Sequence, residues 1–251
     1  MIKVLNYTKN PLMEIGKAAS ICYDSITLEE IIANAKTKKA VGIAKHCLNS
    51  GHTRVAEFAD VTLLIDAYSA RVIREFYTHV IGTSRVQAST RYIKYKDLKF
   101  GYYVPNSIKK NKEAKLIYDD CMDNILDSYS KLLELGIPQQ DAANVLPLGH
   151  NTTIVCKINV RALMHMFEVR TCTRAYEEYR KLMKELKDVV KNLDEQWLFL
   201  CEKHFKTKCE KMMYCDEGQT CGRFPSRVEF EEIIELGKKT KKELELNGFN
   251  G

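Results

Sequence analysis

Apolar residues recur at every third or fourth position over several long segments, which is the pattern of amphipathic helices. The segments are 10–25, 25–52, 69–80, 111–136, 137–149, 159–172, 175–205 and 229–245. Pro11 follows Asn10 at the start of the first segment, and Thr27 and Glu30 have capping-box spacing at the start of the second. Gly51, Gly82 and Gly136 end three of the segments. The pattern therefore predicts a helix-rich chain.

Two other segments have the pattern of strands. In 58–67, Val61, Leu63 and Ile65 alternate with more polar positions, and 152–159 has strand composition. The stretch SRVQASTRY, residues 84–92, follows Gly82, and we expect it to be a loop or a short turn. Many helices with a few separated strands predict a mixed α/β class, and no linker or internal repeat divides the chain into domains. We therefore expect a single domain over residues 1–251.

Composition and charge limit the classes of ligand and the cellular location that we expect. The chain has 251 residues and a formal net charge of +6, from 39 Lys and Arg against 33 Asp and Glu. This excess favours anionic ligands without requiring nucleic acid. The dense basic runs, 107–115 and 237–243, have the character of solvated helix faces, so we expect no nucleic-acid partner. No apolar run is long enough to cross a bilayer, and the first residues lack a signal-peptide pattern, so we expect no membrane and a cytoplasmic location.

Cysteines gather near the end of the chain. The nine cysteines include Cys201, Cys209, Cys215 and Cys221, with His204 among them. Their spacings are wider than the paired Cys-x-x-Cys of common zinc sites. Free thiols are the favoured interpretation, and a structural metal is left as the minor alternative. We predict no metal site.

Basic and hydroxyl side chains form three clusters, each at the edge of a predicted element. The first is GHTRVAEF with His52, Arg54 and Glu57; the second is the stretch 84–92; the third is NVRALMHMFEVRTCTRA, residues 159–175. In the third, Arg161 and His165 share a helix face. Arg170 lies close to the apolar side, where a permanently charged, fork-shaped donor can clamp a planar anionic ligand. Salt bridges to Glu177 or Glu178 are the plainer alternative.

Together the three clusters resemble the flavin-dependent thymidylate synthases. That family has a Gly-His stretch followed by Glu, then the signature Arg-His-Arg-x-x-Ser-x-Asn-Glu-x-Ser-x-Arg-Tyr, and later Leu-Pro, Asn-x-Arg-x-Leu and an Arg before a polar residue and Ala. This chain has GHTRVAEF, YTHVIGTSRVQASTRY and LPLGHNTTIVCKINVRALMHMFEVRTCTRA in the same order. The resemblance is strongest over 15–190 and leaves 201–251 as a cysteine-containing extension. It implies an α/β (α+β) fold with a central mixed or antiparallel sheet flanked by long helices.

The resemblance implies a reaction and its ligands. It is the reductive methylation of deoxyuridylate (dUMP) to thymidylate by an FAD enzyme, with NADPH or NADH and 5,10-methylenetetrahydrofolate as co-substrates, in a homotetramer with shared sites. The residues implied for dUMP are Glu75, Gln87, Ser89, Arg91 and Arg170, with Arg170 catalytic because it would favour loss of the N3 proton. The residues implied for FAD are His52, Arg54, Thr78, His79, Asn159, Arg161 and His165.

Several positions depart from the family pattern. Arg-His-Arg becomes Thr78, His79 and Val80, and Asn-Glu becomes Val86 and Gln87. Arg54 and Arg85 are basic where the family usually is not, so we expect them to approach the ligand anions instead. Two alternatives remain open: flavin-dependent one-carbon transfer to another pyrimidine nucleotide, and a nucleotide-binding homologue without turnover.

Overall fold

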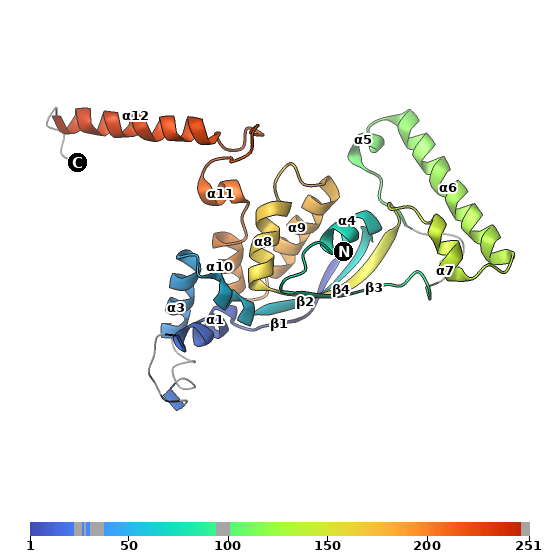
Figure 1. The fold of residues 1–251 in the computed structure, drawn as a ribbon, viewed down its shortest axis with the longest axis horizontal. Helices are drawn as coiled ribbons and strands as arrows, with labels where there is room; N and C mark the ends of the chain where they lie inside the picture. The colour runs from blue at the N-terminus through green and yellow to red at the C-terminus, as the bar shows by residue number, and fades with distance from the viewer. Residues whose placement is uncertain (23–26, 28, 31–37, 94–100, 247–251) are drawn as a thin grey trace.

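The computed structural model describes residues 1–22, 27, 29–30, 38–93 and 101–246 (Figure 1). Its sheet contains β1 (Ile2–Tyr7), β2 (Asp60–Ser69), β3 (Thr83–Gln87) and β4 (Asn151–Asn159). The strand order is β1-β2-β4-β3, and each neighbouring pair is antiparallel. The predicted α/β (α+β) class with an antiparallel central sheet is confirmed.

Helices precede, follow and cover the sheet (Figure 1). Before β2 lie α1 (Pro11–Ser20), α3 (Lys38–Asn49) and the 3₁₀ helix η1 (Thr53–Phe58). Between β2 and β4 lie α4 (Ala70–Phe76), α5 (Asn106–Lys109), α6 (Lys112–Glu134), α7 (Gln139–Ala142) and the 3₁₀ helix η3 (Ala143–Val145). After β4 come α8 (Val160–Arg170), α9 (Glu177–Val190), α10 (Glu195–Lys203), α11 (Lys208–Met212) and α12 (Arg227–Leu246).

The core lies between one face of the sheet and helices α8, α9 and α10. On that face, Val61 pairs with Ile158 and Leu63 with Cys156, and all four side chains are buried. The helices contribute Leu163, Phe167, Leu182, Leu186 and Trp197 to the same buried cluster. The opposite face is more open, since Val86 of β3 and its β4 partner Val155 are 73% and 38% exposed. The sheet therefore gives α8 and α4 a rigid base.

The stretch 84–92, which we predicted to be a loop or short turn, is a strand over 84–87 and a loop with a turn over 88–92. Residues 83–87 form β3, which pairs with β4 so that Arg85 lies opposite Cys156. The helix predicted for 69–80 ends at Phe76, and Val80, which we expected on its apolar stripe, is 65% exposed. Gly82, at φ 74°, then turns the chain into β3. The helix was predicted too long because Val80 continues its apolar spacing, and β3 was missed because residues 83–87 have no apolar alternation.

The helix predicted for 175–205 is two helices, α9 and α10. Asp194 ends the run, because its Oδ1 accepts hydrogen bonds from the amides of Gln196 and Trp197 and so caps α10. Strand β1 was not predicted, since its residues alternate only weakly in polarity. Residues 23–25 of the first predicted helix and 31–37 of the second lie outside the described part of the chain.

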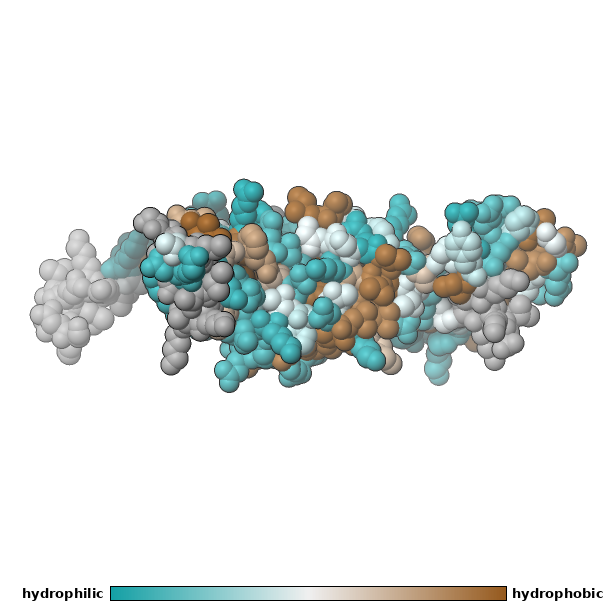
Figure 2. Space-filling model, turned by 90° about the horizontal axis from the view of Figure 1, so that it is seen from below, coloured by the Kyte–Doolittle hydropathy of each residue, from teal (hydrophilic) through white to brown (hydrophobic). Residues whose placement is uncertain are grey.

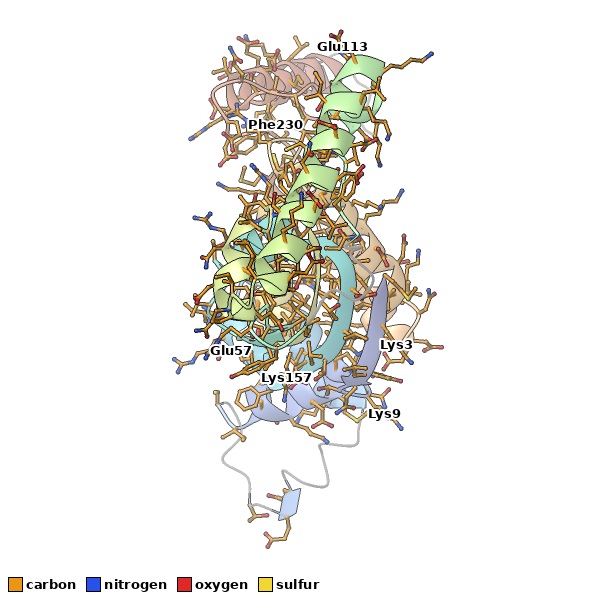
Figure 3. The ribbon with its side chains drawn as sticks, turned by 90° about the vertical axis from the view of Figure 1, so that its right-hand side faces the viewer. Lys3, Lys9, Glu57, Glu113, Lys157 and Phe230 are labelled. Atoms are coloured by element: carbon orange, nitrogen blue, oxygen red, sulfur yellow. The ribbon has the colours of Figure 1, made fainter. Side chains whose placement is uncertain are left out.

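Two helices project from this body. Figure 1 places α6 and α12 on opposite sides of the sheet, and in Figure 3 Glu113, at the start of α6, and Phe230 of α12 both lie far from Lys157. Apolar side chains also reach the surface, and brown atoms gather in the middle of one face in Figure 2. Large exposed apolar residues include Ile81, Val86, Leu116 and Ile117. Within the described residues, no helix combines the length and apolar character that crossing a membrane requires.

Candidate active site

A cavity of about 550 Å³ opens beside the first turns of α8. Such a volume is within the range of about 300–1,000 Å³ that is usual for small-molecule sites. It is lined by Thr53, Glu57, Thr78, His79, Val80, Ile81, Asn159, Arg161, Ala162, Met164, His165 and Glu168. Five of the seven residues expected to hold the flavin are in this set. The chain thus brings residues from η1, from the turn after α4 and from α8 to one site.

The N-terminus of α8 is fixed by Asn159. Its Oδ1 accepts a hydrogen bond from the Ala162 amide at 2.8 Å, which caps the helix. From there, Arg161, His165 and Glu168 follow at helical spacing along the wall of the cavity. Arg161 donates to Glu57 of η1, so an ion pair links the two elements at the rim of the cavity.

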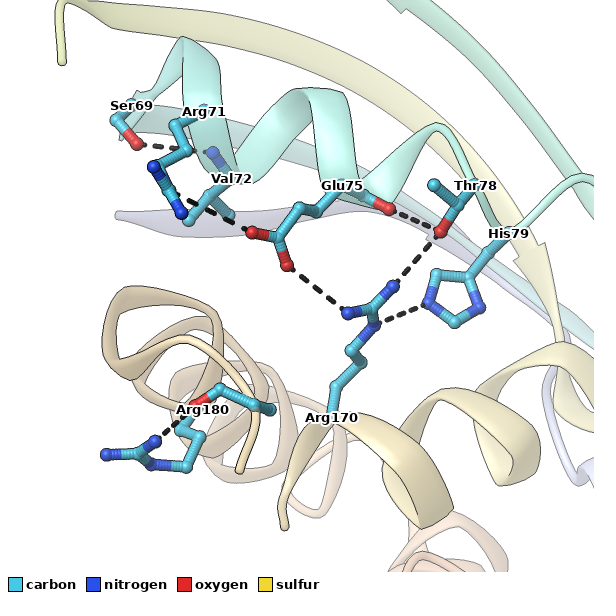
Figure 4. Close-up of polar contacts among 9 residues, drawn as sticks. Ser69, Arg71, Val72, Glu75, Thr78, His79, Arg170 and Arg180 are labelled. Atoms are coloured by element: carbon cyan, nitrogen blue, oxygen red, sulfur yellow. Dashed lines mark hydrogen bonds and ion pairs between the residues drawn. The ribbon is translucent and has the colours of Figure 1, made fainter. Parts of the chain in front are cut away.

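The guanidinium of Arg170 is held from several sides at the end of α8 (Figure 4). Its Nε donates to His79 Nε2 at 3.0 Å, and its Nη1 donates to a Glu75 carboxylate oxygen at 3.2 Å. Its Nη2 donates to Thr78 Oγ1 at 3.1 Å, and the Tyr179 ring centroid is 4.8 Å from its central carbon. Thr78 and His79 line the cavity, so Arg170, which is not itself a lining residue, lies directly behind this part of its wall.

Helix α4, which carries Glu75, is tied to α9 by a buried carboxylate. Ser69 caps α4, because its Oγ accepts a hydrogen bond from the Val72 amide at 3.2 Å (Figure 4). Glu178 of α9 accepts hydrogen bonds from the Ser69 amide at 2.7 Å and from its hydroxyl at 2.5 Å. Burial raises the pKa of the Glu178 carboxyl, and the bonds from Ser69 oppose this rise. Glu178 therefore holds the start of α4 in place instead of pairing with Arg170.

His79 is neutral around pH 7. Burial, then the positive charge of Arg170, then His165 and Arg85 lower the pKa of its imidazole to about 4. Since the guanidinium of Arg170 can only donate, His79 Nε2 accepts and the ring proton is on Nδ1. A neutral imidazole of this tautomer orients Arg170 without opposing its charge.

We expect this histidine to make stability depend on pH. Between pH 6.5 and about 4, His79 is protonated in the unfolded chain and neutral in the folded chain. The unfolded state therefore binds more protons, and the free energy of unfolding rises with pH over this range. The stabilisation is complete above pH 6.5 and is lost as pH falls toward 4. From pH 7 to pH 5 the loss is about 2 kcal/mol per histidine. Urea unfolding of the wild type and of His79→Gln at both pH values measures it.

A second histidine requires a matched control. His204 is also buried, and burial followed by Lys211 and Lys206 lowers its pKa to about 4. The wild type should therefore lose stability at both sites on acidification, and His79→Gln at only one. His52→Gln alters an exposed side chain and should behave as the wild type. An equal acid loss in His79→Gln and the wild type would contradict the assignment.

Other residues expected at the site lie elsewhere in the single chain. Gln87 Nε2 donates to Thr152 Oγ1 at 3.3 Å at the end of β3, and Ser89 Oγ accepts from the Arg91 amide at 3.3 Å. Arg91 is exposed and lies over the Tyr92 ring. His52 and Arg54 are exposed on either side of Thr53, which lines the cavity. The assignment of these five residues to ligands stays a prediction, as does that of the residues at the cavity.

Several residues that shape the site were not predicted for it. Val80, Ile81, Ala162 and Met164 supply its apolar wall, and Glu57 and Glu168 supply carboxylates. Glu57 was named in the first sequence cluster and Glu168 lies in the third, near His165, but neither was assigned to a ligand. The role of Tyr179 beside Arg170 had no local signal, because the two residues belong to different helices.

The residues that line the cavity suit the flavin ring implied by the resemblance, but they supply little positive charge for its diphosphate. Apolar walls and the donors of Asn159 and Thr78 match a flat ring with polar atoms along its edge. The carboxylates of Glu57 and Glu168 pair with Arg161 and with Lys211 of α11. Arg161 is the one Arg or Lys among the described lining residues, so the cavity has little positive charge left for a diphosphate.

The C-terminal extension contacts the last turn of α8 and the segment that follows it. Lys211 pairs with Glu168 at 2.7 Å, and Arg174 pairs with Glu217 at 3.4 Å. Its thiols are free: Cys201 is buried, Cys209 and Cys215 are half-buried and Cys221 is exposed. The extension therefore packs next to the site through charged groups.

Comparison with known proteins identifies the family of the chain. The family model described as Thy1, thymidylate synthase complementing protein, matches residues 3–194. The chain is 30% identical to the flavin-dependent thymidylate synthase of Geobacter sulfurreducens over 192 residues, 76% of this chain and 82% of the relative. It is 30% identical to that of Nitratidesulfovibrio vulgaris (90% and 96% covered) and 31% identical to that of Pyrococcus horikoshii (87% and 90% covered). The chain therefore belongs to the thymidylate synthase complementing protein family, the flavin-dependent thymidylate synthases.

Proposed function

We propose that this chain methylates dUMP to thymidylate, with FAD, 5,10-methylenetetrahydrofolate and NADPH or NADH, in the cytoplasm. The observation that carries the proposal is the position of Arg170, whose guanidinium contacts Thr78 and His79 in the wall of the cavity. The relatives named above are flavin-dependent thymidylate synthases, and this chain covers most of each. Family membership and the arrangement of the site support the same reaction.

The role of Arg170 follows from its charge and its surroundings. A guanidinium stays charged at any physiological pH and offers several N–H donors in one plane. In the complex, carbonyl oxygens of the pyrimidine replace Glu75 and Thr78 as acceptors for these donors. The positive charge then stabilises the negative charge that develops on the ring when the N3 proton passes to solvent water, and this charge activates C5.

The neighbouring residues orient these groups. His79 remains an acceptor for Arg170 Nε because its imidazole is neutral, and Asn159 and Arg161 present donors along the cavity. Bound FAD would supply hydride chemistry at this place, and the protein supplies binding and orientation. Buried Met164 helps to exclude water from the reacting atoms, and the exposed Val80 and Ile81 would do so once a neighbouring subunit covers them.

We also propose that the site is completed between subunits of a homotetramer. Gln87, Ser89 and Arg91 have their own contacts at the end of β3, while Arg170 is held at the end of α8. The cavity is poor in positive charge, and Val86 and Ile81 expose apolar surface. A neighbouring subunit that brings Ser89 and Arg91 to the cavity would add positive charge there and would cover the exposed apolar surface.

Purified protein tests the function directly. We expect yellow protein whose flavin absorbance is bleached by NADPH or NADH, and tritium release from C5-labelled dUMP in the presence of methylenetetrahydrofolate. Release with another pyrimidine nucleotide but not with dUMP would favour the other one-carbon transfer. Binding of dUMP without any release would favour the non-catalytic homologue.

Mixed subunits test the shared site. Arg91→Ala and Arg170→Ala proteins are each expected to be inactive. Mixed after reversible dissociation, they should regain activity if one subunit contributes Arg91 and another Arg170. No recovery in mixtures that form tetramers by light scattering would contradict sharing.

A further inference from the structure

Arg85 is directed toward backbone carbonyls of the turn that carries His79, and not toward the cavity. Its Nη1 donates to the carbonyl oxygen of His79 at 2.7 Å and to Thr83 Oγ1 at 2.6 Å. Its Nη2 donates to the carbonyl oxygen of Tyr77 at 3.0 Å. The Tyr77 ring centroid is 4.5 Å from its central carbon. The expectation that Arg85 approaches a ligand anion therefore finds no support in its contacts.

These contacts meet a need of the local backbone. Helix α4 ends at Phe76, and the chain turns through 77–82 before β3 begins. The carbonyls of Tyr77 and His79 lie at and beyond the end of α4, where the helix supplies no amide partner, so they take other donors. A guanidinium can serve two carbonyls at once because its N–H groups lie in a rigid plane. Arg85 thereby links the carbonyls of Tyr77 and His79, in the turn after α4, through one guanidinium.

The backbone of Arg85 is held in the sheet. Its backbone lies in β3, in register with Cys156 of β4, whose side chain is 1% exposed. The turn 77–82 is thus attached to the sheet at Gly82 through the chain and at Tyr77 and His79 through Arg85. Strand residues with paired backbones move less than loops, so the sheet can hold the turn in one conformation.

The same turn holds Arg170. His79 is gripped at its carbonyl by Arg85, while its ring accepts the hydrogen bond from Arg170 Nε. The adjacent Thr78 accepts from Arg170 Nη2. A continuous series of hydrogen bonds therefore runs from β3 through Arg85 and His79 to Arg170. Arg85 is not among the residues that line the cavity.

We propose that Arg85 is a positioning residue, which aims Arg170 at the pyrimidine by fixing the turn that carries Thr78 and His79. The inference rests on the proposed function for its consequence in catalysis. Its structural part, the control of Arg170 by Arg85, can be measured without turnover. Hydrogen bonds from charged groups contribute enough that losing them should change the rate at least about tenfold.

Arg85→Met tests the proposal, with Arg74→Met as the matched control. Arg74 is an exposed arginine of α4, so its replacement removes the same charge close by and leaves the turn intact. For Arg85→Met we expect kcat with dUMP to fall about tenfold or more, with a smaller change in KM. Arg74→Met should match the wild type. Assays run well below the melting temperature of each variant, so that only folded protein is compared.

A second readout does not need activity. Modification by phenylglyoxal, followed by mass spectrometry of the peptide that contains Arg170, reports how well Arg170 is held. We expect several-fold faster labelling of Arg170 in Arg85→Met than in Arg74→Met. If the wild type binds no dUMP and does not turn it over, the proposed function fails, and the labelling rates still decide the role of Arg85.

A conservative variant separates positioning from stability. Arg85→Lys keeps the charge but cannot serve both carbonyls, so it should lie between the wild type and Arg85→Met in kcat and in labelling. If Arg85→Met does not fold, kcat and Arg170 labelling are compared between Arg85→Lys and Arg74→Lys. Lower kcat and faster labelling in Arg85→Lys would support the positioning role, and equal values would contradict it. A folded Arg85→Met with unchanged kcat and unchanged Arg170 labelling, whatever its melting temperature, would overturn the proposal.

Discussion

Replacing Arg170 with alanine should abolish thymidylate synthesis while leaving the chain folded. The substitution removes the guanidinium that contacts Glu75, Thr78 and His79. Each charged hydrogen bond to the substrate is worth about 1.5–3 kcal/mol, so loss of two would lower kcat/KM by about 10²- to 10⁴-fold. Rescue of a thymidine-requiring bacterium, with tritium release from labelled dUMP on purified protein, measures the effect.

The controls for Arg170→Ala depend on the contacts that Glu75 keeps and on the charge that is removed. Without Arg170, Glu75 keeps only the longer contact to Arg71, at 4.0 Å, among its ion pairs in the described residues. Arg170→Lys retains charge without the planar fork and should recover only part of the activity. Arg227→Ala removes an exposed α12 arginine that pairs with Glu231, and should rescue as the wild type does. If Arg170→Ala supported growth and near-normal tritium release, Arg170 would not be the catalytic residue.

Periodicity predicted the elements whose signals are local. The alternation of Val61, Leu63 and Ile65 identified β2, and the apolar helical periodicity of 159–172 identified α8. Gly51 and Gly136 were expected to end helices, and both have positive φ values. In each case the relevant information is carried by residues only a few positions apart.

Strand β3 and the role of Arg85 could not be predicted in the same way. Residues 83–87 have no apolar alternation of their own, and they are a strand because they pair with β4, some seventy residues later in the chain. Arg85 could be recognised as basic, but the carbonyls that it serves are gathered only when the turn after α4 folds back. The resemblance identified residues of the cavity, and the contacts around Arg170 required the fold.

Gly82→Ala should damage both stability and flavin binding, because this glycine meets two demands. Its φ of 74° is left-handed, which costs another residue roughly 1–2 kcal/mol. An added Cβ would also lie 2.5 Å from Asn159 Oδ1, the atom that caps α8. Loss of a cap costs about 1 kcal/mol, so the total loss of unfolding free energy should be about 2–3 kcal/mol. Urea unfolding measures it.

Gly136→Ala separates the two contributions. Gly136 has nearly the same φ, 79°, but no heavy atom lies within 4 Å of where its Cβ would be. This variant should therefore lose only the roughly 1–2 kcal/mol of backbone strain and keep its flavin. In Gly82→Ala the displaced Asn159 no longer presents its amide to the cavity, and flavin affinity, measured by fluorescence titration, should fall up to about tenfold. Equal stability and equal flavin affinity in the two variants would show that Asn159 had moved aside without cost, and that its cap does not shape the cavity.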